Sequence, residues 1–180
     1  MKQETTELQT AIDIAKKAHA GQVDKQGIEY FLHPLTVSSM VDGDRAKIAA
    51  ILHDVIEDTN VTYDELVTAG IGEDILVAVD CLTKQAVGLG CPSKGGSQRL
   101  ETWEENLKRI ATNDTAIEVK FADMFHNMDT TRWSKEKKEE AERNAEKYFE
   151  RIVALIRLVG KAKARRYIRK ELCDKWFGDA

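Results

Sequence analysis

Apolar residues recur at helical spacing along most of this chain. The clearest stripes run through Leu8–Ala20 and Lys135–Val159, where apolar positions three and four apart alternate with polar ones. The same spacing marks shorter predicted helices at Pro34–Met40, Tyr63–Thr68, Glu73–Leu82, Leu100–Ala111 and Asp114–Met128. No run shows the two-residue alternation of a half-buried strand between turn residues. The pattern therefore predicts an all-α bundle of about eight to ten helices.

The segment Ala46–Thr59, AKIAAILHDVIEDT, predicts a core helix that carries unusual polar groups. Residues four apart share one face of a helix, so His53 would stack over Glu57. Asp54 would stack over Asp58 in the same way. Three carboxylates and an imidazole in a core each cost several kcal/mol when they are unpaired. A bound metal beside a pocket would account for them, and the alternative is a partly exposed amphipathic helix with a solvated acidic edge.

Glycine and proline place the boundary between the first two predicted helices. Gly21 follows the first apolar stripe as a stop signal, and Gly21–Leu32, GQVDKQGIEYFL, predicts a connector. Pro34 suits the first position of the next helix, and a residue before proline is disfavoured in the helical region. His33 should therefore stand at the mouth of that helix. There it is either a metal ligand or a simple polar cap.

Two further segments leave their roles open. Lys84–Ser97, KQAVGLGCPSKGGS, contains four glycines and Pro92, and it is either a solvated loop or a flap over a ligand. It lacks the glycine spacing of a phosphate-binding P-loop. The basic tail KAKARRYIRKELCDKWFGD predicts a last docked helix over residues 161–176, with contact to an oligomer partner or an acidic ligand as the alternative.

Length and composition set broad limits on the protein. The 180 residues predict a single domain over 1–180, with a core at about 8–158 and the basic helix at 161–176. A formal charge of −4 gives no argument for binding nucleic acid or an anionic membrane. No segment approaches the roughly 18 apolar residues of a membrane span, so we expect a cytoplasmic protein. Cys81, Cys91 and Cys173 are widely spaced, and we expect them to be reduced.

The candidate metal ligands stand at separate points of the chain. They are His33, His53, Asp54 and Asp123. Two imidazoles and two carboxylates suit Mn²⁺, Fe²⁺, Co²⁺ or Zn²⁺ better than a thiolate zinc site or an all-oxygen calcium site. Such an ion would keep positions open for water and substrate. Glu57 and Asp58, one turn along, could orient that water or carry its proton.

Several segments together give the chain a family resemblance. They are AHAGQ at Ala18–Gln22, YFLHP at Tyr30–Pro34, AAILHDVIEDT at Ala49–Thr59, LTK at Leu82–Lys84, ENLKR at Glu105–Arg109 and VKFADMFHNM at Val119–Met128. In this order and spacing the chain resembles the HD superfamily of metal-dependent phosphohydrolases. Over roughly residues 8–158 it is more closely similar to the hydrolase domain of the Rel/Spo alarmone enzymes and to the stand-alone small alarmone hydrolases.

The resemblance implies a fold, a reaction and residue roles. The fold would be an all-helical HD bundle without a synthetase domain. The reaction would be Mn²⁺-dependent removal of pyrophosphate from the 3′ position of a nucleotide such as ppGpp, with other divalent transition metals as alternatives. By position, the family's metal ligands match His33, His53, Asp54 and Asp123. Its catalytic acidic pair matches Glu57 and Asp58, and its nucleotide contacts match Lys25, Asn127 and Thr130.

Two positions depart from the family pattern. The family has an arginine before the lysine of the first connector, where it lies against the purine base, and this chain has Asp24 there. An acidic side chain cannot stack as a guanidinium does, and it would repel a nearby polyphosphate. Met124 replaces a basic residue of the family motif LADRLHN or LADKLYN. We therefore expect an intact metal site and an altered base site, with ppGpp and adenine alarmones such as pppApp both open.

Three functions remain as hypotheses. The first is a 3′-pyrophosphohydrolase of (p)ppGpp or (pp)pApp in the stringent response. The second is another HD phosphatase that acts on a nucleoside monophosphate or NADPH. The third is a binding protein that has lost turnover, against which the pair Glu57 and Asp58 argues, because binding alone does not need it. The expected partner is a small-molecule nucleotide, and assembly into a homo-oligomer stays open.

Overall fold

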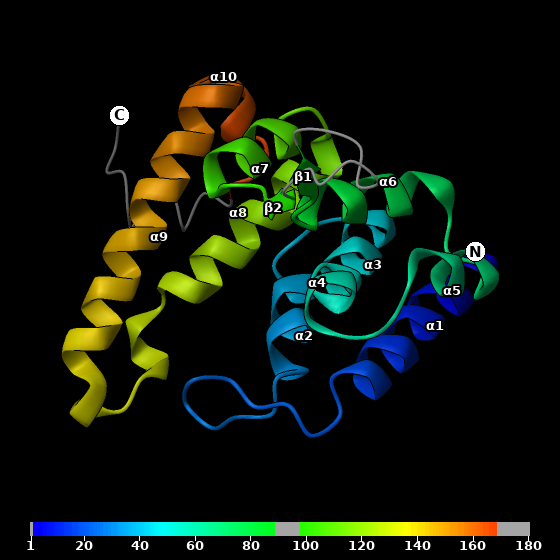
Figure 1. Cartoon of the computed structure of the whole chain (residues 1–180), viewed down its shortest axis with the longest axis horizontal. Coiled ribbons are helices and arrows are strands. Elements are labelled where there is room, and N and C mark those ends of the chain that lie inside the picture. The colour runs from blue at the N-terminus through cyan, green and yellow to red at the C-terminus, as the bar shows by residue number, and fades with distance from the viewer. Residues whose placement is uncertain (1, 89–97, 169–180) are drawn as a thin grey trace.

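A computed structural model describes residues 2–88 and 98–168 of the chain, and this part is almost entirely helical (Figure 1). The helices are α1 (Lys2–Ala18), α2 (Leu32–Ser39), α3 (Asp44–Leu52), α4 (Val55–Asp58), α5 (Tyr63–Thr68), α6 (Glu73–Leu82), α7 (Trp103–Ile110), α8 (Asp114–Met128), α9 (Lys138–Val159) and α10 (Lys161–Ala164). Also present are two short strands, β1 (Ala86–Gly88) and β2 (Gln98–Leu100), and the 3₁₀ turns η2 (Thr130–Arg132) and η3 (Lys135–Lys137). The predicted all-α bundle is confirmed.

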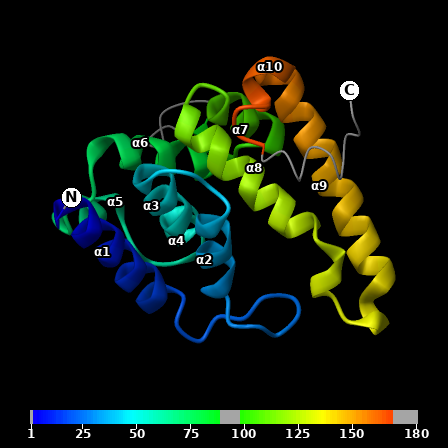
Figure 2. The same cartoon turned by 180° about the vertical axis from the view of Figure 1, so that it is seen from behind.

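Helix α3 lies at the centre of the core. It packs against α1, α2, α6 and α8, and its apolar residues Ile48, Ile51 and Leu52 are fully buried. Facing helices can approach closely, because α3 also carries small residues and α1 turns Ala11 and Ala15 into the core. Figures 1 and 2 show α1 to α5 gathered on one side of the molecule and α7 to α10 on the other.

Helix α8 joins the two sides of the bundle. It packs against α2, α3 and α6 on one side and against α7 and α9 on the other. Its side chains Ile117, Phe121, Met124 and Met128 are fully buried, and the long helix α9 covers it. Asp123 therefore lies within one of the most apolar helix faces of the molecule.

Local capping chemistry fixes several helix ends where the sequence predicts them. Thr62 and Glu65 form the expected capping box at the start of α5. The side chain of Asn113 caps α8, and Gly160, with φ of +85°, ends α9. Helices α5, α6 and α8 have the predicted bounds. Thr102 also forms a capping box, at the start of α7, which the sequence reasoning missed.

The predicted continuous helix over Ala46–Thr59 is wrong, because the chain breaks into α3 and α4 at His53 and Asp54. Asp54 has φ of −103° and ψ of −5°, away from regular helical values. Nδ1 of His53 donates to the Ala50 carbonyl at 2.7 Å, which satisfies an acceptor at the end of α3. Adjacent side chains of a regular helix diverge by about 100°. Here His53 Nε2 and Asp54 Oδ2 lie 3.0 Å apart.

Four other helices have boundaries that differ from the prediction. Helix α1 spans Lys2–Ala18 rather than Leu8–Ala20. Helix α2 begins at Leu32, so His33 lies inside its first turn rather than before it, and its N–H donates to the Tyr30 carbonyl at 2.9 Å. Helix α7 begins at Trp103 because the preceding residues pair in β2. Helix α9 begins only after the turn η3.

A two-stranded hairpin occupies part of the predicted loop. Strands β1 and β2 are antiparallel, with Ala86 opposite Leu100 and Val87 opposite Arg99. Three-residue strands are too short to show a period, so the pattern missed them. The predicted helix over residues 161–176 is wrong in its described part, because α10 ends at Ala164 and a turn follows. Residues 89–97 of the predicted loop and 169–176 of the predicted tail lie outside the described residues, so the flap and the rest of the tail stay predictions. No helix in the described ranges is both long and apolar enough to cross a bilayer.

Candidate functional site

The structure brings the four expected metal ligands together between α2, α8 and the α3–α4 junction. His33 Nε2 lies 3.3 Å from Asp123 Oδ1 and 3.6 Å from Asp54 Oδ2. His53 Nε2 lies 3.0 Å from Asp54 Oδ2 and 3.8 Å from Asp123 Oδ1. Ligand atoms of His33, His53 and Asp123 all lie within 4.8 Å of one another. His33, His53 and Asp123 could therefore hold one metal ion, and Asp54 lies beside both histidines.

The His53 ring presents a buried nitrogen to the carboxylates of the cluster. Its Nδ1 is used by the Ala50 carbonyl, so Nε2 is the nitrogen that remains for the site. Nε2 makes no hydrogen bond of good geometry in the described part of the chain, and it lies 3.0 Å from Asp54 Oδ2. An imidazole nitrogen beside two carboxylates is typical of a metal ligand. The residues present therefore fit a divalent metal.

His126, which the sequence reasoning missed, orients His33. The Nδ1 atoms of the two rings lie 2.7 Å apart, and the rings stack with centroids 4.9 Å apart. Burial lowers the pKa of His126 to about 4, and the charges of His33 and Arg132 add to this effect. His126 is therefore neutral near pH 7 and accepts the proton of His33 Nδ1, which leaves His33 Nε2 facing the carboxylates. The sequence contains only a weak signal for this role, which is that His126 belongs to the segment FADMFHN.

Asp123 is held and kept ionised by its neighbours on α8. Lys120 Nζ lies 2.8 Å from Asp123 Oδ2, and the side-chain amide of Asn127 donates to Asp123 Oδ1. Burial would raise the pKa of Asp123, but Lys120 and the two histidines of the cluster hold it well below its usual range. Asn127 was expected to contact the nucleotide, and it also fixes the orientation of a ligand carboxylate.

Tyr30 joins the metal cluster to the acidic pair. Its hydroxyl lies 2.6 Å from Asp54 Oδ2 and 3.2 Å from Asp58 Oδ2. Burial and the charge of Asp54 raise the pKa of Asp58. Burial and the same charge raise the pKa of Tyr30 above its usual range, so its hydroxyl remains a donor. Asp58 is therefore the member of the acidic pair better suited to hold a proton.

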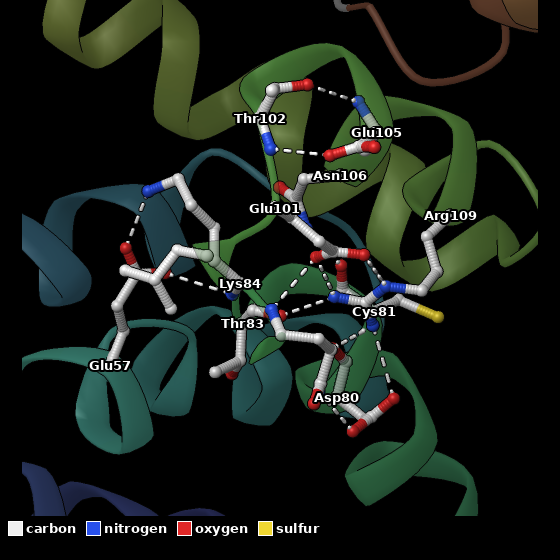
Figure 3. A network of polar contacts seen from close by, with 12 residues as sticks. Glu57, Asp80, Cys81, Thr83, Lys84, Glu101, Thr102, Glu105, Asn106 and Arg109 are labelled. Carbon is white, nitrogen blue, oxygen red and sulfur yellow. Dashed lines mark hydrogen bonds and ion pairs between the residues drawn. The ribbon is translucent and has the colours of Figure 1, made fainter. Parts of the chain in front are cut away.

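Glu57 has a different environment, because Lys84 holds both of its oxygens (Figure 3). Lys84 Nζ lies 2.7 Å from Glu57 Oε1, and the backbone N–H of Lys84 donates to Oε2 at 3.2 Å. The Glu57 side chain is 33% exposed and lines the cavity described next. A water molecule in that cavity could therefore contact a carboxylate whose position is already fixed.

All of these groups except His126 line one cavity of about 370 Å³, a size that suits a small ligand. Lys25 and Asn127 line it together with the metal cluster and the acidic pair. Thr130 lies exposed at the start of η2 and is not among the lining residues, so its substrate contact stays a prediction. Met124 contributes apolar surface where the Rel/Spo pattern has a basic residue.

Positive charge gathers on the wall of this cavity. The lining cations are Lys25, Lys84, Lys120, Arg132 and Arg151. The Arg151 guanidinium lies 5.5 Å from the ring centroids of both Trp103 and Tyr148, and it has no hydrogen bond or ion pair with a described residue. Burial and the nearby charges, that of Arg151 first, lower the pKa of Lys147. The wall therefore suits an anionic ligand.

The family model that matches this chain is that of the HD domain, over residues 11–158. The chain belongs to the HD domain family. A guanosine-3′,5′-bis(diphosphate) 3′-pyrophosphohydrolase of Borreliella burgdorferi is 35% identical to it over 125 residues, which are 67% of this chain and 18% of that protein. A probable GTP pyrophosphokinase of Mycobacterium leprae is 31% identical over 160 residues, which are 86% of this chain and 19% of that protein. This HD domain thus spans less than a fifth of these curated relatives.

A solved structure also resembles this HD domain. It is that of a metazoan ortholog of SpoT that hydrolyzes ppGpp and plays a role in starvation responses. The likeness has a TM-score of 0.59 at 22% identity and covers 92% of this chain and 95% of that one. At this identity the comparison shows a shared fold, which is the helical arrangement described above.

Asp24, where this HD domain departs from the Rel/Spo pattern, does not present a free charge to the cavity. Its Oδ1 accepts hydrogen bonds from the backbone N–H groups of Gln26 and Ile28 at 2.8 and 2.9 Å. Its Oδ2 lies 3.1 Å from Arg132 Nη2. Arg132 therefore offsets the repulsion of a polyphosphate that we expected from Asp24. Arg132 also donates to the His126 carbonyl at 3.2 Å, so it links the first connector to α8.

Metal binding to this HD domain should release a proton and strengthen with rising pH. Burial opposes charge on His53, but Asp54 and Asp123 outweigh it and raise the pKa of His53 to about 9 in the metal-free protein. Below this pH a metal must displace the proton, so affinity should rise by about tenfold per pH unit. Calorimetric titration with Mn²⁺ at pH 7, in buffers of different ionisation enthalpy, measures the protons released. Metal binding without proton release would contradict this assignment.

Replacement of His126 should weaken metal binding. The variant His126→Phe removes the acceptor that fixes His33 Nδ1, so the Mn²⁺ dissociation constant should rise by about 10- to 100-fold. His126→Gln retains an acceptor oxygen and should recover part of the loss. Titration of Mn²⁺ followed by electron paramagnetic resonance gives the constants directly. Equal affinity in the wild type and His126→Phe would show that this contact does not orient His33.

Proposed function

We propose that this HD domain is a metal-dependent hydrolase that removes pyrophosphate from the 3′ position of a nucleotide alarmone such as ppGpp or pppApp. One observation carries the proposal: the histidine–aspartate cluster, the pair Glu57–Asp58 and several cations line the same cavity. A metal, a proton carrier and positive charge are the groups that a polyphosphate hydrolase needs. The printed names of the Borreliella relative and the metazoan structure support the choice of substrate.

The proposed metal ligands are the four converging side chains described above. His33, His53, Asp54 and Asp123 would hold the ion, and we assign Mn²⁺ to the site. A divalent ion held there would supply Lewis-acid activation of water and neutralise charge on the phosphoryl group. The hydrogen bonds that His33 donates to His126 and His53 donates to the Ala50 carbonyl orient the two imidazoles before any ion binds.

The acidic pair divides the remaining chemistry between its two members. In the reaction, water forms a new bond to the phosphorus next to the ribose, the bond from that phosphorus to the 3′ oxygen breaks, and this oxygen takes a proton. Asp58, whose pKa is raised, would take the proton from the attacking water and pass it to the 3′ oxygen. Glu57, fixed by Lys84, would orient that water. The products are pyrophosphate and a nucleotide with a free 3′ hydroxyl.

The unpaired cations of the wall would bind the phosphates. Lys25 and Arg151 line the cavity and have no carboxylate partner among the described residues. The Arg151 guanidinium lies 5.5 Å from the ring centroids of Trp103 and Tyr148, and its N–H groups would donate to phosphate oxygens. The cavity therefore favours a ligand with several phosphate charges over an uncharged one. We propose a cytoplasmic location, because the proposed substrate is a nucleotide.

A panel of substrates tests the proposed reaction. The Mn²⁺-loaded protein should release pyrophosphate from ppGpp or pppApp, measured by anion-exchange chromatography. Glu57→Gln and Asp58→Asn should each retain Mn²⁺ binding and lose about 10²- to 10⁴-fold in kcat, because general acid–base groups contribute this much. Asp64→Asn, on the exposed surface of α5, is the matched acidic-to-amide control.

Two outcomes of the panel would overturn the proposal. Orthophosphate as the sole product, from a nucleoside monophosphate or NADPH, would make the protein another HD phosphatase. No product from any nucleotide, with metal bound, would leave a binding protein. Unchanged turnover in both amide variants would remove the roles assigned to Glu57 and Asp58 even if pyrophosphate is released.

The contact from Arg151 should contribute to substrate affinity rather than to the chemical step. Arg151→Gln removes a charged donor to phosphate, so KM should rise by about 10- to 100-fold while kcat changes little. Arg143→Gln is the matched control, because Arg143 lies on the same helix and pairs only weakly with Glu139, 3.9 Å away at the surface. Steady-state kinetics with the substrate found in the panel gives both constants. A fall in kcat at unchanged KM would contradict this role.

A further inference from the structure

Arg109, from the ENLKR segment on α7, joins three separate parts of the chain behind the cavity wall (Figure 3). It is not among the residues that line the cavity. Its Nε donates to Glu101 Oε1 at 2.9 Å, and its Nη2 donates to Glu101 Oε2 at 2.8 Å. Its two Nη groups also donate to the backbone carbonyls of Asp80 and Thr83. All three nitrogens of the guanidinium are therefore used, which a lysine could not reproduce.

These contacts fix the path of the chain where it leaves α6. The carbonyls of Asp80 and Thr83 belong to the end of that helix, where backbone acceptors lack partners within the helix. Glu101 Oε2 also accepts from the backbone N–H of Gln85 at 2.9 Å, and the N–H of Glu101 donates to the Gln85 carbonyl at 2.9 Å. Within the segment 83–85, Arg109 therefore binds the Thr83 carbonyl, and Glu101 binds the backbone of Gln85.

Lys84 lies between these two fixed residues. Its backbone N–H and its ammonium each bind one oxygen of Glu57, at 3.2 and 2.7 Å. The Lys84 side chain is itself 38% exposed, so packing around it does not hold it in one place. The position of its backbone N–H depends instead on the segment 83–85. Figure 3 shows the resulting series of contacts from Arg109 through Thr83 and Lys84 to Glu57.

We propose that Arg109 is a positioning residue for Glu57, acting through the segment 83–85 and Lys84. The proposal rests on the function proposed above, because it gives Glu57 the task of orienting water. Arg109 contributes no atom to the cavity and acts only by fixing the backbone that carries Lys84. A misplacement of about 1 Å in a catalytic group can lower the rate by about 10²-fold, so distant supports of this kind can be measured.

Kinetics of Arg109→Met test the proposal. The variant should lower kcat by about 10- to 100-fold with little change in KM, because Glu57 acts on the water and not on the bound phosphates. Arg99→Met is the matched control, since Arg99 binds Glu105 on the same hairpin–helix unit with two 2.6 Å contacts and touches neither Lys84 nor Glu57. The control should keep the wild-type kcat.

A double-mutant cycle separates positioning from a general structural role. In a Glu57→Gln background the carboxylate that Arg109 is proposed to position has already lost its role, so Arg109→Met should cause little further loss of kcat. If Arg109→Met lowers kcat by the same factor in both backgrounds, its effect does not pass through Glu57 and the proposal is overturned. Wild-type kcat in Arg109→Met also overturns it. Glu101→Gln, which keeps an acceptor for Arg109, serves as the weaker second variant if Arg109→Met does not fold.

Hydrogen exchange provides a readout that does not depend on turnover. The backbone N–H of Lys84 is bound by Glu57, so its exchange should accelerate in Arg109→Met and remain slow in Arg99→Met. Mass spectrometry of a peptide covering residues 80–86 would show this. If the wild type hydrolyses no substrate, the proposed function fails while this measurement still decides whether Arg109 fixes Lys84. Unchanged exchange in Arg109→Met would refute the positioning role.

Discussion

The structure depends on burying two imidazoles and two carboxylates together inside a helical core. Each of these groups would cost several kcal/mol if it had no partner. Polar groups around the cluster therefore hold its members, as His126 does for His33 and Lys120 does for Asp123. The break between α3 and α4 follows from the same constraint, because adjacent side chains of a regular helix diverge and cannot face one ion.

Two arginines extend this support to segments beyond the core. Arg132 binds Asp24 of the first connector and the His126 carbonyl of α8, so it links the rim of the cavity to the neighbour of a ligand histidine. Arg109 binds the end of α6 and Glu101, and so fixes the wall that carries Lys84. In both cases a planar guanidinium with several donors joins separate parts of the chain.

The sequence predicted the features that depend on residues close together in the chain. It failed to predict features that depend on contacts between residues far apart in the chain. Helices α5, α6 and α8 have the expected bounds because periodicity and capping residues act within a few positions. The partnership of His33 and His126 joins residues 93 positions apart, and no local pattern reveals it. The helix break at His53 is local, but the strong helical pattern around it favoured a continuous helix, and the demands of the site overrode that preference.

The cations of the cavity fall into two classes, and this division explains how one small site can serve both binding and chemistry. Lys84 and Lys120 are paired with Glu57 and Asp123, so their charge is largely spent on fixing those carboxylates. Lys25 and Arg151 have no carboxylate partner among the described residues, so their charge remains available to a phosphate. Carboxylates near a polyphosphate would otherwise repel it strongly at low dielectric constant. Paired cations reduce that repulsion beside Glu57 and Asp123, and the two unpaired cations supply attraction elsewhere in the cavity.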